Sequence, residues 1–347
     1  MAHEEEHART LAGSGECCGL SAALPSRIAI RAPNWLGDVV LSLPAVRDLR
    51  RALPRAEIRV VARPAVSPLY EAVPEVDGVI EASGLRAETA ALRGFDLAVL
   101  LTNSFGTALA ARLARVPTRW GYATQGRGLL LTHGARVPGD VSGRSQVHYY
   151  RAMLAAMGLP TSDALDTSIT PLPAWKGSAR ALLGPGRFLG IAPGAAKGSA
   201  KQWPPERFAA AADRLAAELG AGTVLLGAPA DLGAANAVAG AMKSPVINLC
   251  GKTDLRTFVG LVASLDGLMA NDSGAMHIGA AVGIPTVGIF GPTNPLETHP
   301  IGARAGFVRG VAECSPCKHV TCPIDHRCMT SVAPDAVADA LLREVRS

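Results

Sequence analysis

The chain has 347 residues, which is more than one typical domain, so we expect two. Hydrophobic residues make up 48% of the sequence and aromatic residues only 4%, a balance that suits an α/β core of small aliphatic side chains. No apolar run is long enough to span a bilayer, and the acidic N-terminus does not resemble a secretory signal. The net charge of +5 is modest, and the basic residues lack the aromatic interleaving of nucleic-acid platforms, which disfavours a nucleic-acid partner.

The first 26 residues are expected to form a disordered leader to a domain over residues 27–165. A short strand over 27–31 leads through a loop to Asp38 and into a helix with apolar residues from Val39 onward. Open α/β sheets bind ligands at the carboxyl ends of their strands, so Asp38 is either a helix cap or a general base that faces a cleft. A buried Trp35 would help to desolvate that carboxylate.

Later strands over 58–61 and 95–101 alternate with helices, which predicts a parallel sheet covered on both faces. Asn103 lies in the polar turn after the second of these strands. Seven arginines and one acidic residue fall between residues 112 and 151. Such a zone would attract phosphates or an anionic membrane surface, although ordinary ion pairs on a solvated face are the alternative. The candidate contacts to an anionic acceptor are Asn103, Arg127, Arg136 and Arg144.

The pattern starts again after an expected linker at 166–186, in a second domain over 187–332 that is followed by a C-terminal helix at 333–347. Its first strand, 188–192, leads into a glycine-rich turn that holds Lys197 and Lys201, which suits a diphosphate. This turn lacks the Gly-Lys-Ser/Thr ending of a Walker loop. Neither first strand is followed by Gly-x-Gly-x-x-Gly, which disfavours a nicotinamide dinucleotide site.

A strand at 268–270, a polar turn at 271–274 and a helix at 275–282 follow one another near the end of the second domain. The backbone N–H groups of Ser273 and Gly274, at the start of the helix, would form a seat for phosphate. The alternative is that Asp272 and Ser273 only cap the helix.

Four cysteines form the pattern C-x2-C-x4-C-x5-C near the C-terminus. They are Cys314, Cys317, Cys322 and Cys328. In a cytoplasmic chain such a cluster suggests zinc or an iron–sulfur cluster, and two disulfides or free thiols remain alternatives. A metal with four protein ligands would be structural rather than catalytic.

Five motifs, in order and spacing, resemble the ADP-heptose:lipopolysaccharide heptosyltransferases, glycosyltransferase family 9, and within it the type II enzymes most closely. They are Ala-Pro-Asn-Trp-Leu-Gly-Asp-Val-Val at 32–40, Asn-Ser-Phe at 103–105, Pro-Gly-Ala with Lys-Gln-Trp-Pro at 193–204, Asn-Asp-Ser-Gly-Ala-Met-His at 271–277 and Phe-Gly-Pro-Thr at 290–293. The resemblance implies a GT-B fold of two Rossmann-like doubly wound domains facing a cleft. It also implies an ADP-heptose donor, a heptosyl-Kdo2-lipid A acceptor at the inner leaflet of the cytoplasmic membrane, and inversion at the anomeric carbon.

By the same resemblance, Asp38 is the catalytic base and Lys201 the donor-phosphate lysine. The other donor-site residues that it implies are Asp272, Ser273, Gly274 and His277. Because a carboxylate would be repelled by a diphosphate, we expect Asp272 to face sugar hydroxyls. His277 can equally be a core histidine. The family's nucleoside-binding acid has only Asp231 near its position.

Metal-dependent transferases use an Asp-x-Asp site to bind the ion that neutralises the leaving nucleotide. The sequence contains no Asp-x-Asp, so no metal or other cofactor is expected in catalysis. Three alternatives compete with the type II assignment. They are a type I or III member of the same family, a sugar-nucleotide 2-epimerase on the same two-domain plan, and a non-catalytic glycan- or nucleotide-binding protein. Asp38 and Lys201 together argue against the last of these.

Overall fold

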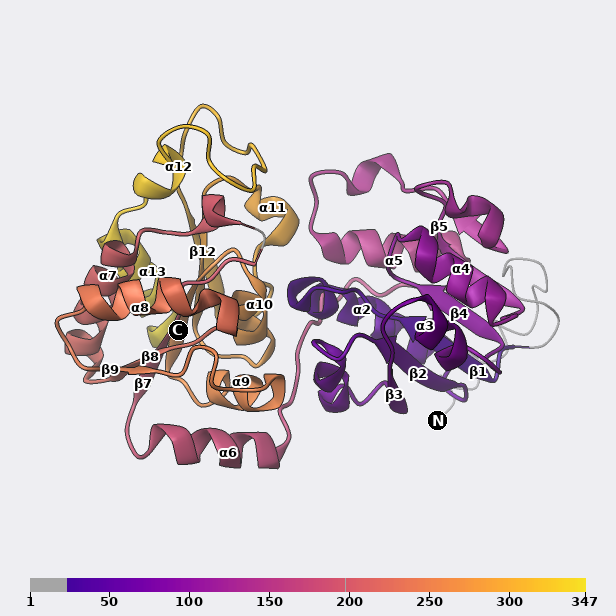
Figure 1. The fold of residues 1–347 in the computed structure, drawn as a ribbon, viewed down its shortest axis with the longest axis horizontal. Helices are drawn as coiled ribbons and strands as arrows, with labels where there is room; N and C mark the ends of the chain where they lie inside the picture. Colours follow the sequence, from indigo (N-terminus) through magenta and orange to yellow (C-terminus); the bar gives the residue numbers. More distant parts are fainter. Residues whose placement is uncertain (1–23, 197) are drawn as a thin grey trace, which may run out of the picture.

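A computed structural model describes residues 24–196 and 198–347; Lys197 and nearly all of the expected leader lie outside these ranges. The described chain forms two α/β units, each built on a six-stranded parallel sheet (Figure 1). The expected GT-B fold of two doubly wound domains is confirmed.

The N-terminal sheet has the strand order β3-β2-β1-β4-β5-β6. Its strands are β1 (Arg27–Arg31), β2 (Glu57–Ala62), β3 (Gly78–Glu81), β4 (Leu97–Leu100), β5 (Thr118–Tyr122) and β6 (His133–Ala135). The central strand pairs on both sides, with Ile28 opposite Ile58 on β2 and Leu97 on β4. The order reverses beside β1, so the loop after β1 lies at a topological switch point, where doubly wound sheets bind ligands.

The C-terminal sheet repeats this plan in the order β12-β11-β10-β7-β8-β9. Its strands are β7 (Phe188–Ala192), β8 (Gly222–Leu225), β9 (Val246–Asn248), β10 (Gly267–Asn271), β11 (Thr286–Phe290) and β12 (Ala305–Arg309). Both β10 and β11 are buried at every residue, as expected for strands covered on both faces. The loops after β7 and β10 emerge side by side, because these two strands are neighbours in the sheet.

Helices cover both sheets (Figure 1). They are α2 (Leu36–Ala52), α3 (Leu85–Ala91), α4 (Phe105–Leu113), α5 (Gln146–Ala156), α6 (Pro173–Leu183), α7 (Pro205–Leu219), α8 (Leu232–Ala241), α9 (Leu255–Val262), α10 (Gly274–Ala281), α11 (Pro295–Thr298), α12 (Arg327–Thr330) and α13 (Pro334–Arg346). The expected linker at 166–186 contains α6, which packs against α9 of the second unit, and α13 packs against α7. Within residues 24–196 and 198–347, none of the helices has the length and hydropathy of a membrane span.

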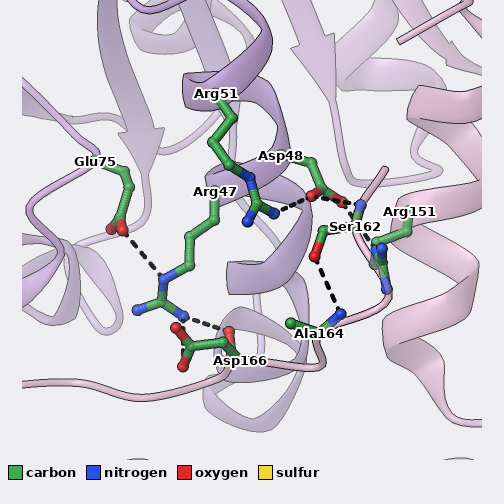
Figure 2. A network of polar contacts seen from close by, with 8 residues as sticks. All are labelled: Arg47, Asp48, Arg51, Glu75, Arg151, Ser162, Ala164 and Asp166. Carbon is green, nitrogen blue, oxygen red and sulfur yellow. Dashed lines mark hydrogen bonds and ion pairs between the residues drawn. The ribbon is translucent and has the colours of Figure 1, made fainter. Parts of the chain in front are cut away.

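A network of polar contacts fastens the connecting segment to the end of α2 (Figure 2). Asp48, with 1% of its surface exposed, accepts from Arg151 Nε at 2.9 Å and from the Ser162 backbone N–H at 3.1 Å. Arg47 Nη2 donates to the carbonyl of Ser168 at 2.6 Å. Helix α2 therefore carries Asp38 at its start and holds the interdomain connection near its end.

The connecting segment also bonds to the second unit, and the two units contact each other directly. The Ile169 backbone N–H donates to the carbonyl of Ala281 in α10 at 2.8 Å. Across the interface, the guanidinium of Arg256 in α9 forms an ion pair with Glu71, and its Nε lies 2.9 Å from the Glu71 carboxylate. The connecting segment thus bonds to both units. In the resulting arrangement the loops after β1, β7 and β10 line one cavity.

Candidate active site

A cavity of about 630 Å³ lies between the two units and is lined by residues from both. Six of the site residues predicted from the sequence meet there, one from the first unit and five from the second. They are Asp38, Lys201, Asp272, Ser273, Gly274 and His277. The volume is in the range of small-molecule sites, so the cavity can hold a ligand of nucleotide-sugar size.

Asp38 lies in the first turn of α2 and lines the cavity. Burial raises the pKa of the Tyr150 phenol, and the nearby charge of Asp38 adds to that shift. Trp35, expected to be buried, is 50% exposed. It stands at the N-cap of α2, outside the buried face of the helix, so its desolvating role is smaller than predicted.

Arg31, a residue that sequence reasoning did not single out, bonds to the loop that leads into the first turn of α2, which carries Asp38. Arg31 is fully buried, and its guanidinium contacts Glu88 at 2.8 Å and Asn34 Oδ1 at 3.0 Å. A second nitrogen donates to the Ala32 carbonyl at 2.5 Å. The available signal was an arginine at the end of a strand with an apolar centre, immediately before the motif at 32–40.

The starts of α2 and α10 meet across the interface, and glycine permits this approach on both sides. A Cβ atom at Gly37 would lie 2.7 Å from His277 Cδ2, and one at Gly274 would lie 2.9 Å from Leu36 Cβ. Both distances are shorter than normal packing allows. His277 is only 4% exposed and forms part of this contact between the helices, while it still lines the cavity.

Lys201 and Asp272 form an ion pair, with Nζ and Oδ2 2.5 Å apart and side chains 15% and 6% exposed. Thr293 Oγ1 donates to the same carboxylate oxygen at 2.8 Å. Asn271, fully buried, accepts from the Trp203 backbone N–H at 3.0 Å and so ties the two loops together. The charge of Lys201 is thereby fixed at the cavity wall. The contact of Asp272 with sugar hydroxyls stays a prediction.

The turn after β8, where the resemblance implies a nucleoside contact, also has an acidic residue at the cavity wall, and its contact with a nucleoside stays a prediction. Asp231 lines the cavity, and its carboxylate accepts from the Ala228 backbone N–H at 2.9 Å. A Cβ atom at Gly194 would overlap that carboxylate, so glycine is required where the loop after β7 passes it.

Of the acceptor candidates, Arg127 differs from expectation, because it is fully buried. Its Nε donates to the Tyr122 carbonyl at 2.8 Å, a second nitrogen donates to the Thr102 carbonyl, and burial lowers its pKa to about 10. It also lies 3.4 Å from Asn103 Oδ1, and Asn103 in turn donates to the Tyr149 hydroxyl at 2.6 Å. Arg127 therefore stabilises the interior next to Asn103, and its charge is not accessible to a ligand at the surface.

Arg136 and Arg144 lie on the surface, as expected. The nearest carboxylate to Arg144 is Asp140, at 3.6 Å, and both side chains of this pair are more than half exposed. Water screens such a pair, so the positive charge of both arginines stays available to an anion.

The segment 311–328, here called the cysteine loop, carries four free thiols. Cys314 is exposed, Cys317 and Cys322 are partly buried, and Cys328 is buried. Burial, with smaller contributions from the three other thiols, raises the pKa of Cys328. Within residues 24–196 and 198–347, no three His, Cys, Asp or Glu side chains lie close enough together to hold a metal ion. A zinc ion or iron–sulfur cluster bound by these cysteines stays a prediction.

Comparison with known proteins gives a consistent result. The model of glycosyltransferase family 9 (heptosyltransferase) matches residues 87–327. Lipopolysaccharide heptosyltransferase 2 of Salmonella typhimurium is 32% identical over 82% of this chain and 88% of its own, and that of Escherichia coli is 31% identical over the same shares. The solved structure of the Escherichia coli ADP-heptose lps heptosyltransferase II is 28% identical, with a TM-score of 0.78 over 92% of this chain and 98% of that one. The chain belongs to glycosyltransferase family 9, the heptosyltransferases, and is a glycosyltransferase.

Proposed function

We propose that the protein transfers heptose from ADP-heptose to the inner core of lipopolysaccharide, with heptosyl-Kdo2-lipid A as acceptor. The observation that carries this proposal is the meeting of Asp38 from one unit with Lys201, Asp272 and the start of α10 from the other in one cavity. The relatives reported above are type II heptosyltransferases, which favours this acceptor over those of the type I and III enzymes.

Asp38 acts as the general base in this proposal. An acceptor hydroxyl is a poor nucleophile at neutral pH, so its proton must leave as the new bond forms. The hydroxyl oxygen attacks the anomeric carbon from the side opposite to ADP, the carbon–phosphate oxygen bond breaks with its electron pair going to ADP, and the proton passes to the Asp38 carboxylate. One displacement of this kind inverts the anomeric centre.

The departing diphosphate needs positive charge, and Lys201 supplies it from the turn after β7. The backbone N–H groups at Ser273 and Gly274 add the positive end of the α10 dipole. Because Asp272 pairs with Lys201, its carboxylate orients the lysine in the cavity as well as facing the sugar. The sequence has no Asp-x-Asp, and we propose that these fixed groups carry the charge without a metal ion.

The acceptor is anionic and lipid-anchored, so it would approach from the inner leaflet of the cytoplasmic membrane. Arg136 and Arg144, both exposed, are the proposed contacts to its charged groups, with Asn103 at the adjoining turn. We propose a cytoplasmic protein that associates peripherally with this membrane and binds no nucleic acid.

The test is ADP release from ADP-heptose, measured with and without heptosyl-Kdo2-lipid A, and a search for the heptosylated product by mass spectrometry. Release that depends on the acceptor, with a product one heptose heavier, is expected. A 2-epimerase would interconvert the donor sugar without the acceptor, and a binding protein would release no ADP. Turnover with only the type I or type III acceptor would change the acceptor assignment.

A further inference from the structure

The cysteine loop contacts the turn that carries Lys201 through the residue immediately before it. Ala200 lies in the short 3-10 turn Ser199–Lys201 and is 2% exposed. Its backbone N–H donates to the carbonyl of Val320 at 3.1 Å. Its carbonyl lies 2.6 Å from His326 Nε2, and a carbonyl can only accept, so this imidazole nitrogen donates. Both backbone polar groups of Ala200 are thus bound by the cysteine loop.

The turn and the loop also fit together at the level of the backbone. Gly198 has φ of +114°, a conformation that favours glycine, and a Cβ atom there would overlap the Val320 carbonyl. Any residue with a Cβ atom at this position would prevent the two segments from approaching so closely. A shift of the loop therefore shifts the turn that carries Lys201.

The same loop supports the partner of Lys201. The backbone N–H groups of Cys317 and Lys318 donate to the carbonyl of Pro292 at 3.0 and 2.9 Å. The next residue, Thr293, donates to Asp272 Oδ2 at 2.8 Å. The cysteine loop thus bonds directly to the turn that carries Lys201 and reaches Asp272 indirectly, through Thr293.

His326 adopts a backbone conformation that L-residues use rarely, with φ of +59° and ψ of +22°. Its own N–H donates to Cys322 Sγ at 3.3 Å, which fixes the turn that directs the imidazole toward Ala200. Such a conformation is energetically unfavourable and persists only where the surrounding contacts stabilise it. The local geometry thus aims one nitrogen of the ring at one carbonyl beside the donor site.

We propose that His326 is a positioning residue for the donor site: its Nε2–H holds the Ala200 carbonyl and thereby sets the direction of Lys201 toward the donor diphosphate. The inference rests on the proposed role of Lys201. It gives the cysteine loop a function in donor binding that does not depend on any bound metal.

The test compares three single variants by calorimetry with ADP and by thermal melting. His326→Phe keeps a ring but removes the N–H donor, and we expect ADP affinity to fall about tenfold, which corresponds to about 1.4 kcal/mol. His326→Gln retains a side-chain N–H and should stay within about threefold of wild type. The matched control is His319→Ala, an exposed histidine of the same loop, for which no change in affinity is expected.

A double-mutant cycle with Lys201→Ala separates this inference from the proposed function. If His326 acts through Lys201, His326→Phe should weaken ADP binding in the wild type and have little further effect once the lysine is gone. If Lys201→Ala weakens binding but His326→Phe does not, or if the two effects add in full, the positioning role is overturned and the lysine assignment stands. If Lys201→Ala leaves ADP affinity unchanged, the proposed role of the lysine fails and the inference with it. If His326→Phe does not fold, His326→Ala replaces it in the same double-mutant cycle.

Discussion

Arg127 offers a sharp test of how the arginine-rich zone is built. The sequence suggests a surface charge, whereas the structure places the guanidinium in the interior with its nitrogens on the carbonyls of Tyr122 and Thr102. Substitution with methionine keeps most of the side-chain length and removes every donor. Arg127→Met therefore isolates the hydrogen bonds from the packing.

The magnitude follows from the two carbonyls to which Arg127 donates. The Thr102 carbonyl would lose its side-chain donor, and a buried acceptor left without a hydrogen bond costs about 1–3 kcal/mol. The Tyr122 carbonyl keeps the Thr124 backbone N–H at 2.9 Å, so the loss there is that of one ordinary hydrogen bond, about 0.5–1.5 kcal/mol. Removing a buried charge offsets part of this, because burial already lowers the pKa of Arg127 to about 10. A net loss of about 1–3 kcal/mol in the free energy of unfolding is expected.

The assay is urea unfolding of Arg127→Met beside Arg136→Met, its exposed counterpart in the same zone. Arg136→Met should change the free energy of unfolding by no more than about 0.5 kcal/mol, as is usual for surface substitutions. If Arg127→Met were as stable as wild type and instead raised the acceptor KM, the stabilising role would be refuted and the surface role restored.

The remaining predictions concern the acceptor, the helix contact and the cysteines. Arg136→Gln combined with Arg144→Gln should raise the acceptor KM and leave the donor KM unchanged, with a smaller effect at high salt, because exposed charges are screened over about 8 Å at physiological ionic strength; an equal rise in both KM values would contradict this. Gly37→Ala should push α2 and α10 apart and lower kcat by up to about 100-fold, with the fold retained at a somewhat lower melting temperature, and wild-type turnover would show that the close contact is not needed. Cys314→Ser with Cys317→Ser should lower the melting temperature while the folded fraction stays active, with elemental analysis of the untagged protein showing whether a metal is lost.

The fold and much of the site were predictable, because their signals are local. The strand, loop and helix around Asp38 follow one another within about a dozen residues, and the turn at 271–274 is equally compact. Strands alternating with helices then require a parallel sheet, which brings such loops to one edge. Asp38 and Lys201 are far apart in the sequence, yet they line one cavity for this reason.

Features that depend on packing between distant segments were not predictable in this way. The burial of Arg127 follows from its bonds to the ends of β4 and β5, and nothing in its own neighbourhood distinguishes it from Arg136. The partner of Lys201 lies 71 residues away, and His326 lies 126 residues from the Ala200 carbonyl that it holds. A single sequence carries no signal for such pairs.

The central claim is that Asp38 takes the proton from the acceptor hydroxyl, and one measurement tests it most directly. The turnover of Asp38→Asn is compared with that of wild type on ADP-heptose and heptosyl-Kdo2-lipid A, in excess EDTA, with ADP affinity measured in parallel. The predicted result is a fall in kcat on the order of 10²–10⁴, the usual contribution of a positioned general base, with ADP affinity and melting temperature retained and wild-type turnover unaffected by EDTA. Turnover of Asp38→Asn within a few-fold of wild type would contradict the assignment of the base, and loss of wild-type activity in EDTA would contradict transfer without a metal ion.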